Sequence, residues 1–262
     1  MRKYYTRPCN FYYGNYAKHL VKIKKALPLA GNNNISFDQL EIFERKKGKN
    51  TKSYLYSINE IKKLNREIKD IVKIDLKKIT SKRKSIIKIK FDNPHIMGVL
   101  NITPDSFSDG GLFFDELKAY KQGELMINDG ASIIDIGGES TRPGSKLVDE
   151  KKEWARIKNT IESLKKNFSN IILSLDTRKS YVMEKGIEAG INIINDVSGL
   201  NFDKKSFNLI NSRKIPFILH HMQGTPSTMQ NNPSYDDVLL DIFDFFEKKI
   251  NFCKKKNYKK DF

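Results

Sequence analysis

Cysteine and long apolar runs are scarce in this sequence of 262 residues. The only cysteines, Cys9 and Cys253, lie near opposite ends, which excludes a disulfide scaffold and a zinc site and favours a reducing compartment. No apolar run approaches the roughly 20 residues needed to cross a bilayer, so a membrane-spanning protein is excluded. The first residues also lack the apolar core of a secretory signal. We therefore expect a cytoplasmic protein with no membrane partner.

Acidic residues are scarce only in the first third of the chain. Residues 1–95 hold 24 basic and 8 acidic side chains, a net charge of +16, whereas residues 96–262 have a net charge of +1. Such a basic region could bind phosphates of a nucleic acid. However, 39 of the 48 basic residues are lysine, and bidentate readers of phosphates and bases are usually arginine. We therefore interpret the charge as a solvated surface and expect no nucleic-acid partner.

The N-terminal region carries mixed helix and strand signals. An apolar stripe with helical spacing runs from Ile58 to Ile71, and Ser57 with Glu60 forms a plausible capping box before it. Residues 85–91 partly alternate apolar and basic side chains, which predicts a half-buried strand. We interpret residues 1–94 as a basic accessory α/β region and residues 95–262 as a second domain.

From His95 onward, short apolar runs alternate with helical stretches. Continuous apolar runs are typical of strands buried on both faces of a parallel sheet. The alternation predicts an α/β fold, either a (β/α)8 TIM barrel or a doubly wound sheet. The expected strands are Ile96–Leu100, Ile133–Ile136, Ile171–Leu175, Ile191–Ile194 and Phe217–Leu219, and the expected helices are 116–128, 150–167, 179–189, 203–213 and 235–256.

Polar side chains occur at or near the end of each expected strand. In such folds reactive groups gather beyond the carboxyl ends of the strands. Any one of these residues could instead cap the following helix, and for His220 and His221 we favour a hydrogen-bonding role. Taken together, they favour convergence on one site. The residues are Asn101, Asp135, Asp176, Asn195, Asp196, His220 and His221.

Two loops have compositions that packing does not require. The first follows Asn101 and contains Pro104, two acidic residues and a diglycine, a composition typical of a closing active-site loop. The second, residues 137–144, contains hydroxyl groups, glycines and Arg142, which can grip a phosphate in bidentate fashion. The second loop therefore suggests an anionic ligand.

These segments resemble the dihydropteroate synthase family. Residues 97–111 and 130–144 are similar to its two signature segments, and further matches follow in order to the end of the chain at 174–177, 193–199 and 221–226. The resemblance implies a TIM barrel that joins p-aminobenzoate to 6-hydroxymethyl-7,8-dihydropterin diphosphate and releases pyrophosphate with help from Mg²⁺. It also implies that sulfonamides bind. The expected partners are therefore small-molecule substrates.

The resemblance also assigns roles to individual residues. Asn101 matches a metal-contacting asparagine, and a neutral oxygen suits Mg²⁺ that takes most of its charge from substrate phosphates. Thr141 and Arg142 match residues that contact the diphosphate substrate. Asp176 and Asn195 match the residues that read the pterin, where an ionised carboxylate accepts from N–H groups and an amide offers both donor and acceptor.

Five further residues complete the expected site. Met222 would line the pterin slot as an adaptable apolar wall. Phe107 and Pro143 match positions beside p-aminobenzoate. Asp105 or Asp109 could stabilise cationic character at the pterin methylene, although either could equally be a turn residue.

The number of βα units is smaller than the family pattern implies. Residues 96–262 give five units of about 33 residues each, whereas eight units would need roughly 267 residues. We therefore expect only about the first five units of the barrel, with little activity from this chain alone. A homodimer is expected for a full-length protein.

Two other functions remain open. A pterin-dependent methyltransferase uses a related barrel and heterocycle, but it cleaves no diphosphate and has no reason to keep Asn101 to Phe107 together with Ser140 to Pro143. An inactive pterin-binding fragment is the second alternative. Dependence of binding on the diphosphate would distinguish all three.

Overall fold

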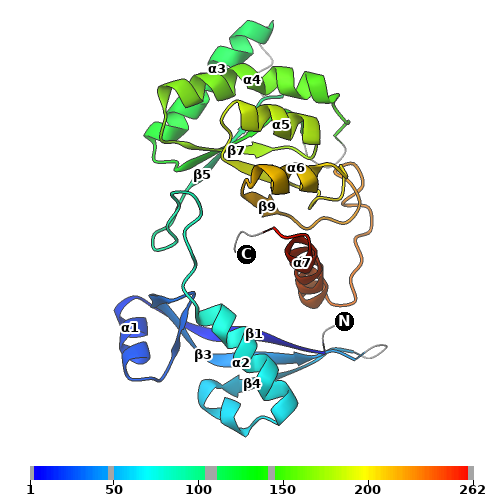
Figure 1. Cartoon of the computed structure of the whole chain (residues 1–262). Helices are drawn as coiled ribbons and strands as arrows, with labels where there is room; N and C mark the ends of the chain where they lie inside the picture. Colours follow the sequence, from blue (N-terminus) through cyan, green and yellow to red (C-terminus); the bar gives the residue numbers. More distant parts are fainter. Residues whose placement is uncertain (1–2, 47–49, 104–110, 141–144, 259–262) are drawn as a thin grey trace. The chain divides into compact units, whose positions relative to one another are not determined.

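The computed structural model describes residues 3–46, 50–103, 111–140 and 145–258, and within residues 111–115 it describes the backbone only. The chain divides into two compact units (Figure 1). The first comprises residues 1–85, 90–92 and 237–244, and the second comprises residues 86–89, 93–236 and 245–262. This division differs from the expected boundary at residue 95, because residues 86–89 belong to the second unit and residues 237–244 to the first.

The first unit is built on an antiparallel sheet whose long strand β3 pairs with all three others. Its buried residues include Phe37, Leu40 and Ile42, and all three lie on β3. This sheet was not expected from the sequence. Its elements are β1 (Tyr4–Tyr13), α1 (Gly14–Lys22), β2 (Leu27–Leu29), β3 (Asn32–Glu44), β4 (Lys52–Ser57), η1 (Ile58–Lys63) and α2 (Arg66–Thr80).

The apolar stripe of the first unit forms two short elements instead of one helix. The 3-10 helix η1 begins after Ser57, whose backbone N–H donates to Glu60 Oε2 at 2.8 Å, as a capping box requires. The chain leaves helical geometry at Leu64, and Asn65 caps α2 by accepting from the Ile68 N–H at 3.0 Å. A strong asparagine cap in the middle of the stripe thus divides it in two.

The second unit contains a five-stranded parallel sheet in the order β5-β6-β7-β8-β9, which is also the order along the chain. All five expected strands and all five expected helices are present, with ends that differ by a few residues. The elements are β5 (Met97–Asn101), α3 (Gly111–Asn128), β6 (Ile133–Gly137), α4 (Glu150–Asn167), β7 (Ile172–Asp176), α5 (Ser180–Glu188), β8 (Ile193–Asp196), α6 (Ser206–Arg213), β9 (Phe217–Leu219) and α7 (Val238–Lys255).

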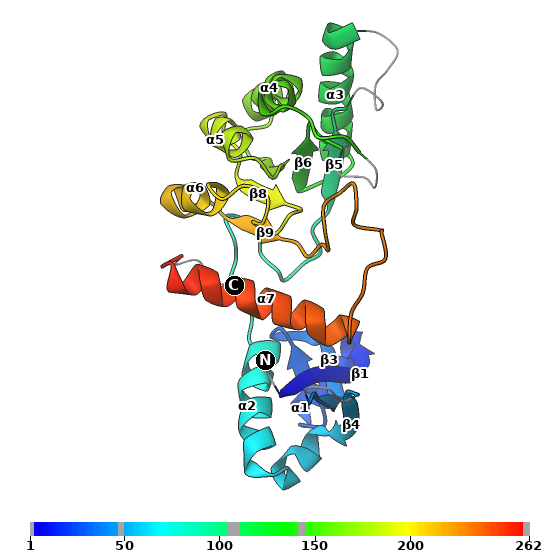
Figure 2. The same ribbon diagram turned by 90° about the vertical axis from the view of Figure 1, so that its right-hand side faces the viewer.

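The two faces of the parallel sheet bury different side chains. One face packs on helices α3 to α6, which lie along that side of the sheet in Figure 2. Alternate strand residues such as Leu100, Ile136 and Leu175 are fully buried there. Neighbouring positions point to the opposite face, because side chains alternate along a strand. On that opposite face β5, β7 and β8 begin with the apolar residues Met97, Ile172 and Ile193 and carry Asn101, Asp176 and Asn195 at or near their ends.

A tight turn covers the amino-terminal ends of the strands. The Ile86 N–H donates to Ile89 O at 3.1 Å and the Ile89 N–H returns to Ile86 O at 2.9 Å, so residues 86–89 close on themselves. Ile89 is buried against Ile133, Ile172 and Ile193, the first residues of three strands. The expected strand over residues 85–91 is therefore wrong: no strand among the described residues pairs with this segment, and burial of Ile89 determines the conformation instead.

We expect Ile89→Ala to lower the free energy of unfolding by about 2 kcal/mol, because it removes buried apolar surface and leaves a cavity at the strand ends that the surrounding residues cannot fill. Chemical denaturation followed by far-UV circular dichroism measures this. Ile87→Ala is the matched control, since Ile87 is exposed and has a positive φ of 57°, which alanine tolerates better than a β-branched residue. Equal effects of the two substitutions would show that Ile89 does not seal the sheet.

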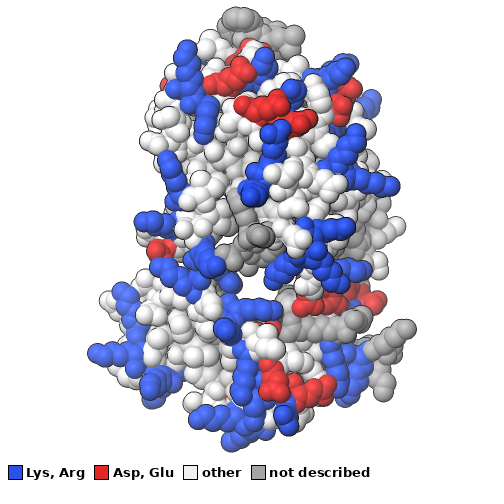
Figure 3. Space-filling model, viewed as in Figure 1, with Lys and Arg blue, Asp and Glu red and all other residues white. Residues whose placement is uncertain are grey.

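Two surface observations bear on the expected partners. In the described part of the chain, no helix has the length and apolar character needed to span a bilayer. On the face shown in Figure 3, lysine and arginine side chains are spread over both units and interspersed with acidic and neutral residues. This distribution is consistent with a solvated surface.

Candidate active site

Polar residues at or near the ends of three strands share one row across the sheet. Asn101 pairs in register with Gly137, Gly137 with Asp176, and Asp176 with Asn195. Residues paired in this way point to the same face of a parallel sheet. The row therefore places Asn101, Asp176 and Asn195 side by side on the face opposite helices α3 to α6, at the carboxyl ends of the strands.

Gly137 leaves space between two members of this row. A Cβ atom at this position would lie 3.4 Å from Asn101 Oδ1 and 3.5 Å from Asp176 Oδ2. Both oxygens thus point toward the position that a side chain would occupy. The glycine keeps open a polar space bordered by an amide oxygen and a carboxyl oxygen.

The Asn195 side chain is held on both sides. Its Nδ2 donates to Asp135 Oδ2 at 2.9 Å, and its Oδ1 lies 2.7 Å from His220 Nε2. Because a carboxylate accepts only, the amide nitrogen must face Asp135, so His220 must carry its proton on Nε2. One amide hydrogen and one oxygen lone pair of Asn195 remain for a ligand.

Asp176 is a buried carboxyl group in an acidic surrounding. Burial, together with the nearby charges of Asp135, Glu153, Asp196 and Glu139, raises its pKa to about 7. Its Oδ1 has no hydrogen-bond partner among the described residues, and the same holds for Asp135 Oδ1. Buried oxygens of this kind are costly unless a ligand supplies donors.

Beneath the polar row lies an apolar layer. Ile133, Ile172 and Ile193 are buried with Ile89 at the opposite end of the same face. An apolar floor keeps water from the far side of the polar groups. Hydrogen bonds made by Asp176 and Asn195 are therefore stronger than they would be in water.

Asp196 has a structural role, unlike its neighbour Asn195. It points to the other face and accepts from the Ser198 N–H at 2.8 Å, the Ser198 hydroxyl at 2.7 Å and the Leu200 N–H at 3.1 Å. These bonds order the loop after β8. Adjacent polar residues at one strand end thus divide into a site residue and a loop-capping residue.

The structure places four of the expected site residues. Asn101, Asp176 and Asn195 come together in the row, and Met222 is half-buried in the loop after β9, three residues beyond Leu219. The other six lie outside the described residues. These are Asp105, Phe107, Asp109, Thr141, Arg142 and Pro143.

Among the described residues, Asn101 is the ligand that the protein offers to the expected Mg²⁺. Asn101 supplies one neutral oxygen toward the open space at Gly137. No cluster of three His, Cys, Asp or Glu side chains suited to a metal occurs within the described ranges. This donor set suits an ion that takes its remaining ligands from water and substrate phosphates, as Mg²⁺ commonly does.

The sequence grouped Asp135 and His220 with the polar strand ends, but it did not indicate that both hold Asn195. Asp135 interrupts the apolar strand Ile133–Gly137. A charged residue at a buried strand position needs a polar partner, and this was the sequence feature that indicated a contact such as the one with Asn195. His220 was expected to be hydrogen-bonded near a strand end, and it is, with Asn195 as its partner. His221 instead packs against the rings of Tyr235 and Phe245.

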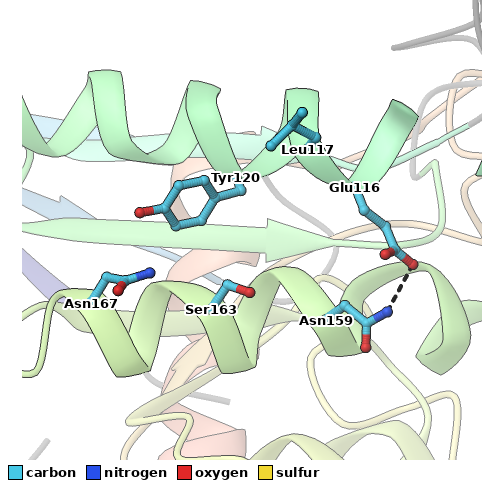
Figure 4. Close-up of a pocket in the computed structure, with 6 residues that line it drawn as sticks. All are labelled: Glu116, Leu117, Tyr120, Asn159, Ser163 and Asn167. Carbon is cyan, nitrogen blue, oxygen red and sulfur yellow. Dashed lines mark hydrogen bonds between the residues drawn. The ribbon is translucent and has the colours of Figure 1, made fainter. Parts of the chain in front are cut away.

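A separate surface pocket of about 280 Å³ lies between α3 and α4 (Figure 4). Glu116 and Asn159 lie at one end of it and are joined by a hydrogen bond of 2.9 Å. The pocket lies on the helix side of the sheet, so it is distinct from the polar row. Its other lining residues are Leu117, Tyr120, Ser163 and Asn167.

Comparison with known proteins agrees with this geometry. Residues 97–261 match the model of the family described as pterin binding enzyme, which is well over half of the chain. The chain belongs to the pterin binding enzyme family. Among relatives, the dihydropteroate synthase of Escherichia coli K12 is 40% identical over 173 residues, covering 66% of this chain and 61% of that protein. That of Haemophilus influenzae is 42% identical over 168 residues, covering 64% and 60%.

Solved structures of dihydropteroate synthases are also similar to this chain. The dihydropteroate synthase of Yersinia pestis with a sulfonamide drug has a TM-score of 0.60 at 38% identity, covering 67% of this chain and 64% of that one. The enzyme of Xanthomonas albilineans with 4-aminobenzoic acid has a TM-score of 0.58 at 36% identity, covering 64% and 58%. The chain spans about 61% of the length of the E. coli relative.

Proposed function

We propose that this chain carries the pterin-binding part of a dihydropteroate synthase with a (β/α)8 barrel. The proposed reaction joins p-aminobenzoate to 6-hydroxymethyl-7,8-dihydropterin diphosphate. The C–O bond between the pterin methylene and the diphosphate breaks, and the arylamine nitrogen forms a C–N bond and loses a proton. The observation that carries the proposal is the row of Asn101, Asp176 and Asn195, with a buried carboxyl oxygen that awaits a donor.

The geometry supports recognition of a flat heterocycle. Ionised Asp176 accepts N–H groups of the ring, and the remaining donor and acceptor of Asn195 suit a mixed edge. Asp135 and His220 fix the Asn195 amide before the ligand arrives, so little orientational freedom is lost on binding. The apolar floor excludes water beneath the ring.

We assign the diphosphate end of the substrate to Thr141 and Arg142, because both match diphosphate-contacting residues of the family that the sequence resembles. Asn101 would hold Mg²⁺, which offsets the negative charge of the departing diphosphate when bound. No nucleophilic side chain is required in this scheme, because positioning and charge stabilisation lower the barrier. Asp105 or Asp109 would stabilise the developing cation at the methylene carbon, and Phe107, Pro143 and Met222 would line the two ring sites.

Calorimetric titration tests this proposal. We expect the chain to bind the dihydropterin diphosphate with Mg²⁺ at least about tenfold more tightly than the diphosphate-free hydroxymethyl pterin, because only the former engages the second loop. Equal affinities would favour a pterin-dependent methyltransferase. Absence of binding to both ligands would contradict pterin recognition by this chain.

A further inference from the structure

A buried network of ionised side chains lies beside the polar row and takes no part in the proposed chemistry. Glu139, two residues after β6, accepts from Arg178 Nη2 at 2.6 Å and from Lys179 Nζ. Lys179 Nζ also donates to Glu153 of α4. All four side chains are at most 8% exposed. Two cations thus balance two carboxylates inside the protein.

The network extends to neighbouring backbone and hydroxyl groups. Thr177 Oγ1 donates to Glu153 Oε1 at 2.5 Å, and Arg156 Nη1 donates to Gly138 O at 2.8 Å. The guanidinium of Arg178 also lies over the Phe202 ring, 4.2 Å from its centroid. The four ionised side chains therefore each make at least two contacts within the protein.

Close packing at Gly138 joins the same region to α4. A Cβ atom at this position would lie 2.7 Å from Glu153 O and 2.9 Å from Ile157 Cγ2. These distances leave no room for a side chain, so the glycine lets the chain after β6 lie directly on α4. The segment 138–140 is fixed by this contact and by the ion pairs of Glu139.

Glu139 and Asp176 depend on different interactions for their positions. Asp176 is the last residue of β7 and is held by pairing with Gly137 and Asn195. Glu139 lies two residues beyond the end of β6, outside the strand ladder. Its position therefore depends on the close packing at Gly138 and on its ion pairs with Arg178 and Lys179, which follow Asp176 in the next loop.

We propose that Lys179 is a positioning residue that holds the start of the second loop relative to the pterin-reading row. Through Glu139 and Glu153 it joins the segments after β6 and β7 to the first turn of α4. The residues that the sequence assigns to the diphosphate follow directly at 141 and 142. This inference rests on the proposed function: Lys179 governs affinity for the diphosphate end of the substrate, whereas strand pairing governs affinity for the pterin end.

The test compares three variants of the full chain. Lys179→Met removes the shared cation, and Glu139→Gln with Lys179→Met removes one charge of each sign, which keeps the buried network neutral if the single variant folds poorly. Lys185→Met is the matched control, because its partner Glu188 lies 2.9 Å away in an exposed pair on α5.

Calorimetry is the first readout. We expect Lys179→Met and the double variant to bind the dihydropterin diphosphate at least about tenfold more weakly than the unmodified chain, with less than a threefold change for diphosphate-free pterin. Lys185→Met should change neither affinity. Parallel loss of both affinities would show a purely structural role and overturn the proposal.

Amide hydrogen exchange of residues 138–140 without ligand is the second readout, and it does not depend on the proposed function. We expect at least about fivefold faster exchange in Lys179→Met and no change in Lys185→Met. Unchanged exchange would overturn the positioning role even if the substrate binds. If the unmodified chain does not distinguish the two pterins, the proposed function fails, and the exchange rates alone decide whether Lys179 holds this segment.

Discussion

Asp176→Asn should weaken binding of hydroxymethyl pterin about a hundredfold at pH 8. The substitution keeps the size of the side chain but replaces an anionic acceptor with an amide whose NH₂ group opposes the N–H groups of the ring. Charge-assisted hydrogen bonds are roughly twice as strong as neutral ones, and a buried donor without an acceptor adds a further cost. Calorimetric titration at pH 8 measures the loss.

The same residue should make pterin binding dependent on pH. The raised pKa of about 7 means that Asp176 is largely protonated at pH 6 and largely ionised at pH 8 in the free chain. Since the ionised form accepts the ring donors, affinity should rise about tenfold between these two pH values. Asp176→Asn should lose this rise and show only the dependence that the ligand itself brings.

The stability of the free chain should change in the opposite direction. The pKa of Asp176 is raised above its ordinary value of 3.8, so the folded state holds a proton that the unfolded state releases. The free energy of unfolding should therefore fall as pH rises from about 4 to about 7, by a contribution on the order of 4 kcal/mol from this group. Asp176→Asn should remove that contribution.

An exposed aspartate provides the control for both measurements. Asp129→Asn makes the same chemical change at an exposed position after α3 and should alter neither affinity nor stability appreciably. If Asp176→Asn binds pterin as tightly as the unmodified chain at pH 8, Asp176 does not read the ring. If the affinity of the unmodified chain is flat between pH 6 and pH 8, the carboxyl group does not titrate in this range.

Gly199→Ala should lower the free energy of unfolding by about 3 kcal/mol or more and weaken pterin binding as well. Gly199 has a positive φ of 60°, and a Cβ atom there would lie 2.4 Å from the backbone oxygen of His220. Backbone cannot rotate away as a side chain can, so the end of β9 must move. His220 would then withdraw from Asn195, and the amide would lose one of its two fixed contacts.

Gly130→Ala separates the cost of backbone conformation from the cost of the clash. Gly130 also has a positive φ, 103°, but no atom lies within 4 Å of its Cβ position. We expect it to cost about 1–2 kcal/mol and to leave pterin affinity unchanged. Thermal denaturation and calorimetry of both variants make the comparison, and equal effects would exclude contact with His220 as the cause.

The parallel sheet could be predicted from the sequence because its signal is local and repeated. Each buried strand is a short continuous apolar run, and each is followed by an amphipathic helix. The polar residues at the strand ends follow from the same repeat, since parallel strands bring their carboxyl ends to one edge. Asn101, Asp176 and Asn195 are polar strand ends of this kind, and their convergence could be predicted from the repeat alone.

The N-terminal sheet was harder to predict because its longest pairing is not local. Strand β3 pairs with its sequence neighbours β2 and β4, but it also pairs along nearly its whole length with β1, from which α1 and β2 separate it. The turn at Ile86 to Ile89 has the same difficulty, because its conformation depends on burial against strands that begin some 45 to 105 residues later. An alternating pattern alone does not show whether a neighbouring strand exists.

The sequence by itself determined the order of strands and helices in the parallel sheet, the polar strand ends and the resemblance to a pterin enzyme, because these depend on side-chain type and local spacing. Only the tertiary structure decided how those groups act. Asn195 is oriented by Asp135 and His220, Asp176 is left with an unpartnered buried oxygen, and Lys179 joins two loops through a neutral buried network. Each of these properties arises from burial and distance between residues remote in sequence, which no local pattern encodes.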